Sequence, residues 1–203
     1  MKINLTQNKN FKLFKIISKV AQENNQTVYI VGGYVRDLLM QRKAPTDIDF
    51  VTEQSGIELA KAVGKELGDL KVSVFKTYGT AMIKYKDLDL EFVGARKESY
   101  SEDSRKPAVE TGTLEDDQKR RDFTVNALAI SLNAENFGEL IDPFNGREDM
   151  QNKILRTPLE PAQTYSDDPL RMMRAIRFAS VLHFKIEKNS LEAIKQEAER
   201  IKI

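Results

Sequence analysis

The chain has 203 residues, enough for one domain with a substantial core or for one domain and part of another. Its formal net charge is +1, which excludes a polycation that binds nucleic acid along its whole length. The absence of cysteine excludes disulfides, thiolate nucleophiles and cysteine zinc sites, and a single histidine, His183, excludes a histidine-rich metal site. No apolar run reaches membrane-spanning length and no signal-peptide core is present, so we expect a soluble, cytoplasmic protein that does not contact membranes.

Helical and strand patterns alternate through the first half of the chain. Apolar residues at helical spacing predict an amphipathic helix over 11–26. The elements predicted after it are strands at 27–33, 46–52, 71–77, 80–86 and 88–95, and helices at 34–42 and 55–70. Ser55 is the expected cap of the second of these helices, and the strands at 80–86 and 88–95 are expected to form a hairpin.

The second half is less regular. The polar segment 96–122 lacks periodicity and predicts a long loop of functional importance. The stretch 123–133 is apolar but fits either a helix or a strand, and 138–158 predicts turns and a short helix. From Asp167 onward two helices are predicted with little between them. The composition thus changes near residue 155, from mixed α and β before it to all-helical after it.

Two carboxylates occupy alternate positions in the predicted strand at 46–52. Asp47 and Asp49 would project from one face while Ile48 and Phe50 turn to the core. Adjacent like charges raise each other's pKa unless a cation lies between them. Because Mg²⁺ typically takes one or two carboxylates together with water and substrate phosphates, the pair predicts a Mg²⁺ site. Two solvated aspartates on a strand edge give the same pattern.

A glycine pair precedes these aspartates. Gly32 and Gly33 stand where the predicted strand gives way to a helix, a position that attracts anions and lets a phosphate approach the backbone. Arg36 can add a charge-assisted contact to a triphosphate. A tight turn with a surface arginine is the alternative interpretation. The segment matches neither the P-loop nor the dinucleotide fingerprint, so a phosphate-binding turn beside a carboxylate pair indicates nucleotidyl transfer.

Glu91 is the candidate for a third acidic ligand. In the predicted strand at 88–95, Asp89 and Glu91 share the face opposite Leu90 and Phe92. A site with two metal ions would activate an attacking hydroxyl and stabilise a pyrophosphate leaving group. Exposed carboxylates without a metal, on a half-buried strand, would give the same sequence pattern.

Five motifs in series resemble those of class II tRNA nucleotidyltransferases and the related bacterial poly(A) polymerases. The motifs are "GGYVRD" (32–37), "DIDF" (47–50), "RRDFTVNALA" (120–129), "DPFNGRED" (142–149) and "DDPLRMMRAIRFA" (167–179). The resemblance implies an α+β fold: a polymerase-β-like nucleotidyltransferase head with a mixed sheet and flanking helices at 1–155, then the start of an all-helical neck at 156–203. It also implies Mg²⁺-dependent addition of CMP and AMP from CTP and ATP to the tRNA 3′ end without a nucleic-acid template.

The resemblance assigns roles to individual residues. Asp47 and Asp49 match the family's metal ligands, and Gly33 and Arg36 match its triphosphate contacts. Arg121 matches a further nucleotide-binding arginine. In the last motif Asp168 and Arg171 match the residues that bind the incoming base, with Asp167 where the family often has glutamate. Arg174 and Arg177 are nucleotide contacts by the same resemblance.

Base recognition by a carboxylate and an arginine is chemically sensible. Asp168 and Arg171 would be neighbours on one helix. The carboxylate accepts from the amino groups of cytosine and adenine, and uracil and guanine present carbonyls instead. Each step of three residues lags a helix by about 60°, so Arg174 still faces the nucleotide while Arg177 lies nearly opposite Asp168. A charged helix face is the alternative for these arginines.

Other activities fit the same residues. A CC-adding enzyme, an A-adding enzyme or a poly(A) polymerase would use the same chemistry, although segment 96–119 resembles the flexible loop associated with adding the final A. A nucleotide- or RNA-binding module without catalysis is an alternative of another class. Because the family continues into body and tail regions, we expect this chain to lack most of them and to extend tRNA weakly.

Overall fold

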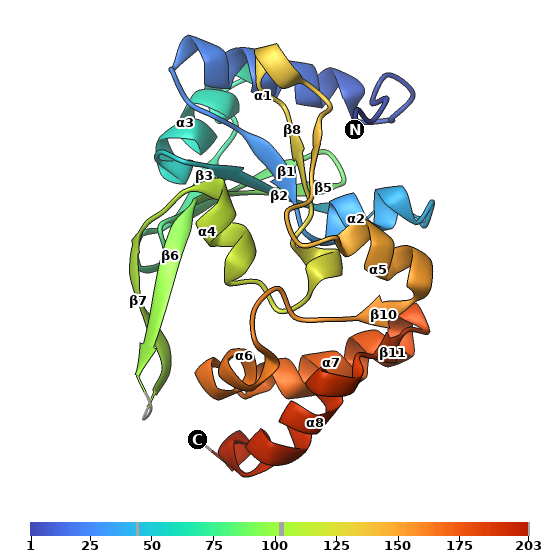
Figure 1. The fold of residues 1–203 in the computed structure, drawn as a ribbon. Coiled ribbons are helices and arrows are strands. Elements are labelled where there is room, and N and C mark those ends of the chain that lie inside the picture. The colour runs from blue at the N-terminus through green and yellow to red at the C-terminus, as the bar shows by residue number, and fades with distance from the viewer. Residues whose placement is uncertain (44, 102–103, 203) are drawn as a thin grey trace.

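A seven-stranded mixed sheet forms the centre of the protein (Figure 1). The computed structural model describes residues 1–43, 45–101 and 104–202. The strand order is β3-β4-β5-β2-β1-β8-β9, with β2 and β5 parallel and the other neighbours antiparallel. The strands are β1 (Tyr29–Val31), β2 (Asp47–Thr52), β3 (Val72–Phe75), β4 (Thr80–Tyr85), β5 (Leu88–Gly94), β8 (Ala129–Ser131) and β9 (Leu140–Ile141). The predicted mixed sheet and the hairpin of β4 and β5 are confirmed.

Helices α1 (Phe11–Glu23) and α3 (Gly56–Glu66) cover one side of the sheet, as Figure 1 shows. Ser55 caps α3 by accepting from the Glu58 amide, as predicted. Beneath these helices, the fully buried rings of Phe50 and Phe92 stack with centroids 5.0 Å apart. Strand alternation thereby turns the acidic residues of β2 and β5 to the opposite face.

The predicted long loop over 96–122 is wrong for its described residues. They form a hairpin of β6 (Arg96–Ser101) and β7 (Ser104–Thr111), followed by α4 (Leu114–Lys119), while residues 102 and 103 lie outside the described part. The hairpin stands apart from the main sheet (Figure 1). Neither of its faces therefore has to be apolar, and its sequence shows no alternation of apolar and polar residues. Thr113 and Asp116 form a capping box that starts α4, a signal present in the sequence.

The stretch 123–133 contains both kinds of element. A 3-10 turn, η2 (Thr124–Asn126), precedes the buried strand β8. The predicted short helix is α5 (Gly146–Asn152). Between these segments lies η3 (Ala134–Asn136), and η1 (Lys76–Tyr78) connects β3 to β4.

The C-terminal part contains three α-helices among its described residues. They are α6 (Pro161–Asp167), α7 (Leu170–Leu182) and α8 (Lys188–Glu197), followed by η4 (Ala198–Lys202). Two short strands, β10 (Ile154–Leu155) and β11 (Lys185–Ile186), pair in parallel. The prediction of an all-helical C-terminal part is therefore wrong in this detail. The division at residue 155 stays a prediction.

The helix predicted to start at Asp167 begins later. Asp167 ends α6, and Asp168 has an extended backbone with φ −139° and ψ 97°. The cause is Pro169, because a proline disfavours helical dihedrals in the residue before it. Asp168 and Arg171 therefore do not lie on one helix, although they remain close in the chain.

Within the part of the chain that the structure describes, no helix is both long and apolar enough to cross a bilayer.

Candidate functional site

A strand–turn–helix unit places the glycine pair at the edge of a cavity. β1 ends at Val31 and α2 (Gly33–Leu39) follows after Gly32. Gly32 has a φ of 71°, which side chains rarely tolerate. A Cβ at this position would lie 2.9 Å from Arg121 Nη1 and 3.5 Å from Asp49 Oδ2. The backbone of the turn thus lies directly beside the guanidinium of Arg121 and the carboxylate of Asp49.

Arg36 lies in α2, and its guanidinium is held by several polar contacts. It is 8% exposed, and its Nε and Nη2 donate to the two carboxylate oxygens of Asp37 at 2.9 and 3.0 Å. Its Nη1 donates to Asn126 Oδ1 at 2.6 Å, and its guanidinium lies 5.3 Å from the ring centroid of Phe178. These contacts fix the orientation of the guanidinium before any ligand binds.

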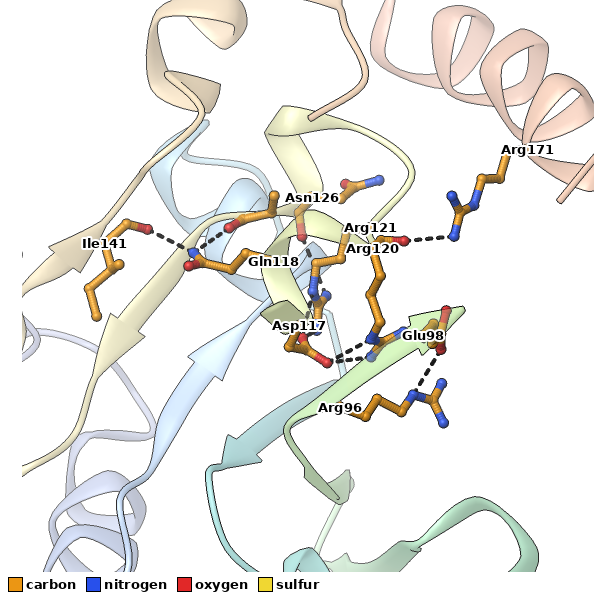
Figure 2. Close-up of polar contacts among 10 residues, drawn as sticks. Arg96, Glu98, Asp117, Gln118, Arg120, Arg121, Asn126, Ile141 and Arg171 are labelled. Atoms are coloured by element: carbon orange, nitrogen blue, oxygen red, sulfur yellow. Dashed lines mark hydrogen bonds and ion pairs between the residues drawn. The ribbon is translucent and has the colours of Figure 1, made fainter. Parts of the chain in front are cut away.

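Asp117 on α4 organises two further arginines, as Figure 2 shows. Its carboxylate has no exposed surface and accepts from Nε of both Arg120 and Arg121, at 2.9 and 3.0 Å. Nη2 of Arg121 adds a third bond at 2.8 Å, and Nη2 of Arg120 a fourth. Burial would raise the pKa of Asp117, but the two guanidinium groups outweigh it and lower that pKa. Asp117 is therefore ionised and aims Arg121 at the glycine turn.

The acidic residues of β2 and β5 lie side by side. In the parallel register Asp49 pairs with Glu91, and Asp47 with Asp89. The pKa of Asp49 is raised by burial and, less strongly, by Asp47, against the opposing effect of Arg121. The pKa of Glu91 is raised by burial and then by Asp49. A divalent cation would relieve this repulsion.

The donors fit a hard divalent cation such as Mg²⁺. In the described part of the chain, no three acidic or histidine side chains are grouped closely enough to hold a metal ion on their own. Mg²⁺ does not need such a group, because it usually takes one or two carboxylates and completes its shell with water and phosphates. Asp47 and Asp49 would hold it, and both this assignment and the role of Glu91 stay predictions.

Arg171 and Arg174 reach the cavity from α7. Arg171, 8% exposed, donates through Nη2 to the backbone oxygen of Arg120 at 2.7 Å (Figure 2). Arg174 pairs with Asp122, with Nη2 2.6 Å from Oδ2. Asp168 accepts from the Leu170 amide at 3.1 Å, which orients its carboxylate at the junction of α6 and α7.

One cavity of about 370 Å³ collects most of the predicted residues. The predicted residues that line it are Gly32, Gly33, Arg36, Asp49, Arg121, Asp168, Arg171 and Arg174. The structure places Asp47 and Glu91 on the same sheet face but outside the cavity lining, and Arg177 outside it on the exposed surface of α7. Arg177 packs against Phe178 with 4.7 Å between guanidinium and ring centroid.

Sequence reasoning missed several residues of the cavity. Arg120, Asp122, Asn126 and Phe178 line it, and Asp117 supports it from beneath. Asn126 joins Arg36 to Asp122, to which its Nδ2 donates at 2.9 Å. All of these residues except Asp117 lie within quoted motifs, and that membership is the signal that could have found them.

Comparison with known proteins identifies the family. Residues 28–156 match the model of the poly A polymerase head domain. The chain is 45% identical over 168 residues to the A-adding tRNA nucleotidyltransferase of Aquifex aeolicus, covering 83% of this chain and 20% of the relative. It is 40% identical over 176 residues to the CCA-adding enzyme of Lactobacillus helveticus, covering 86% of this chain and 42% of the relative. The chain thus spans less than half the length of these relatives.

Solved structures show the same fold. A CCA-adding enzyme in its apo form II superposes with a TM-score of 0.87 and 37% identity, covering 96% of this chain and 45% of that one. A tRNA nucleotidyltransferase complexed with a primer tRNA and an incoming ATP analog gives a TM-score of 0.78 at 39% identity, covering 90% of this chain and 50% of that one. The matched range, residues 28–156, includes the glycine turn, β2 and the pair Arg120 and Arg121. The chain belongs to the poly A polymerase head-domain family of nucleotidyltransferases.

Proposed function

We propose that this chain carries the nucleotidyl-transfer centre of an enzyme that adds CMP and AMP, taken from CTP and ATP, to the 3′ end of tRNA. The observation that carries the proposal is the single cavity in which the backbone of Gly32, the carboxylate of Asp49 and the guanidinium of Arg121 meet. Acting on tRNA would place the protein in the cytoplasm.

An anionic triphosphate would bind at the end of the cavity that Gly32, Arg36 and Arg121 form. Gly32 allows close approach to the backbone, while Arg36 and Arg121 supply two fixed forks of N–H donors. Because each guanidinium is already oriented by a carboxylate, little conformational freedom is lost when phosphate oxygens bind. These residues would hold the leaving pyrophosphate in line with the attacking hydroxyl.

The transfer itself forms one bond and breaks one. The 3′ oxygen of the tRNA bonds to the α-phosphorus, the bond from that phosphorus to the bridging oxygen breaks, and pyrophosphate leaves. The proton of the hydroxyl passes to a neighbouring carboxylate or to water. Mg²⁺, held by Asp47 and Asp49, would supply charge neutralisation and lower the pKa of the hydroxyl.

Base choice is assigned to Asp168 and Arg171. Both line the cavity, and Arg171 is anchored to the Arg120 backbone oxygen. The carboxylate would accept from the amino group of cytosine or adenine, and the guanidinium would donate to a ring acceptor. Uracil and guanine would leave the carboxylate unpaired. Arg174 would approach the same nucleotide, and Arg177, which lies outside the cavity lining, would contact the nucleotide only from the helix surface.

The direct test incubates the chain with Mg²⁺, labelled CTP or ATP, and tRNA that lacks its 3′ end. We expect weak transfer, which Asp49→Ala abolishes. The matched control is Asp89→Asn, which removes a carboxylate from the same sheet face at a site paired with Lys84 at 3.7 Å on the surface. Transfer that survives Asp49→Ala contradicts the metal assignment, and nucleotide binding unchanged without Mg²⁺, with no turnover, contradicts catalysis.

Addition of A alone is a second candidate. It is favoured by the 45% identity to the A-adding relative of Aquifex aeolicus. The products separate the functions. Growth of a tRNA lacking all three terminal nucleotides by two residues with CTP, and by a third when ATP is added, supports CCA addition, whereas growth only of tRNA already ending in CC, with ATP, supports A addition. A long tail would indicate poly(A) synthesis.

We also propose the division of the chain into a head at 1–155 and the start of a neck at 156–203. A separate small cluster of Tyr165, Met172 and Ala193 supports it. The main core also includes Ala175 and Leu182, so the two parts are packed together. Limited proteolysis tests the boundary, and a first cut near residue 157 would support it.

A further inference from the structure

A second cavity, of about 430 Å³, lies on the sheet near the carboxylates. It is lined by Phe75, Tyr78, Thr80, Met82, Glu91 and Arg96. None of the functions assigned above uses its aromatic side chains.

The strand register fixes the place of this cavity relative to the first one. Along one row of the sheet, Met82 pairs with Glu91 and Glu91 pairs with Asp49. Phe75 pairs with Thr80 two residues from Met82, so it points to the same face. The sheet order β3-β4-β5-β2-β1 then puts the carboxylates between the glycine turn after β1 and the aromatic edge at β3. The two cavities flank the carboxylates from opposite sides.

The lining of the second cavity suits a nucleoside attached to a phosphodiester. Phe75 and Tyr78 are 47% and 67% exposed, unusual for large aromatic side chains. Exposed aromatic rings stack on nucleobases without regard to sequence. Arg96 adds a guanidinium whose Nε is 3.0 Å from Glu98 Oε1, and a guanidinium has further N–H donors for a phosphate. Aromatic faces beside one cation are typical of single-stranded RNA sites.

In-line phosphoryl transfer gives a reason for a ligand at this place. The attacking and leaving oxygens lie roughly in line with the phosphorus between them. If the triphosphate lies against Gly32 and Arg121, its leaving group points to that side of Asp49. The hydroxyl must then arrive from the side of Glu91, where the second cavity lies.

We propose that the second cavity binds the 3′-terminal nucleoside of the RNA acceptor. Its base stacks on Phe75 and Tyr78, Arg96 binds the phosphate that precedes it, and its 3′ hydroxyl faces Asp49 and Glu91. This inference rests on the proposed function, because it needs a triphosphate in the first cavity.

The test measures binding of a short RNA whose 3′-terminal base is 2-aminopurine, a fluorophore quenched by stacking. We expect the unsubstituted chain to quench it in the presence of Mg²⁺ and a CTP analogue that cannot react. Tyr78→Ala and Phe75→Ala should each weaken RNA binding by about 5- to 150-fold, the range for loss of one stacked base. Tyr78→Phe keeps the ring and should keep both the affinity and the quenching.

The matched control is Val74→Ala. Val74 lies on the same strand but on the opposite face and is 36% exposed, so its removal should leave RNA binding unchanged. Affinity for CTP should be unchanged in all these variants, because none of them lines the first cavity.

The outcomes separate this inference from the proposed function. If CTP binds and transfer occurs while Tyr78→Ala and Phe75→Ala keep their RNA affinity, the acceptor site is elsewhere and only this inference fails. No quenching by the unsubstituted chain at saturating RNA, or binding of a second CTP that Tyr78→Ala abolishes, also overturns it. Loss of CTP binding and of transfer in the unsubstituted chain contradicts the proposed function instead.

Discussion

Replacing Asp117 with asparagine would remove a buried negative charge that two arginines share. Arg120 and Arg121 each donate two bonds to this carboxylate, which has no exposed surface (Figure 2). Asparagine keeps the shape but presents one oxygen and an amide donor. Both guanidinium groups would then lose a charge partner, and Arg121 would no longer be aimed at Gly32.

The magnitude follows from the burial. Removing one partner of a buried ion pair costs about 3–5 kcal/mol of the free energy of unfolding. In a domain of this size each kcal/mol lowers Tm by about 2–4 °C. We therefore expect Asp117→Asn to lower Tm by about 6–20 °C. The matched control on the same helix is Glu115→Gln, which breaks an exposed pair with Lys119 and should change stability by less than about 1 kcal/mol.

The assays are thermal unfolding across pH and titration with CTP and Mg²⁺. Because the pKa of Asp117 is lowered in the fold, its stabilisation is present above its unfolded pKa and is lost as pH falls through the lower folded value. The difference in Tm between Asp117→Asn and the unsubstituted chain should therefore vanish well below pH of about 4. CTP affinity of the folded variant should fall, because Arg121 is released. A Tm within about 2 °C of the unsubstituted chain at neutral pH, with unchanged CTP affinity, would refute the reasoning.

Three further predictions test the first cavity. At neutral pH and without Mg²⁺, the Tm of Asp49→Asn should be higher than that of the unsubstituted chain, because the raised pKa of Asp49 means that its charge destabilises the fold. This difference in Tm should shrink as pH falls and Asp49 takes up a proton. Mg²⁺ should raise only the Tm of the unsubstituted chain. Gly32→Ala should lower the free energy of unfolding by about 1–2 kcal/mol and should also lower the affinity for CTP. The control Gly33→Ala should leave the fold intact, because its Cβ would make an ordinary 3.6 Å contact. Equal Tm values for the two variants would contradict this prediction. Arg171→Lys should reduce the preference for CTP over UTP in single-turnover transfer by about 5- to 150-fold, and an unchanged preference would exclude Arg171 from base choice.

The face assignments of the sheet could be predicted because strand alternation is a local property. Asp47 and Asp49 project opposite Ile48 and Phe50, which are fully buried, as the pattern predicts. The tight turn at Gly32 was likewise visible in the sequence, because the change from strand to helix demands an unusual dihedral there.

The contact between Asn126 and Arg36 could not be predicted, because the two residues are 90 positions apart in the sequence. Asp117 lies only three and four residues from Arg120 and Arg121, but its burial beneath them comes from the packing of α4 and not from a local pattern. The place of Asp168 was missed although Pro169 supplied the reason, since a proline pushes the preceding residue out of the helix. The hairpin of β6 and β7 was missed because its two strands lie outside the main sheet and show no apolar alternation.

A crystal of the chain soaked with CTP and Mg²⁺ tests the central claim most directly. The account predicts the triphosphate against Gly32 and Arg121, a cation on Asp47 and Asp49, and the cytosine beside Asp168. Density for CTP at another place, or a triphosphate in this cavity with no cation on either aspartate, would contradict it.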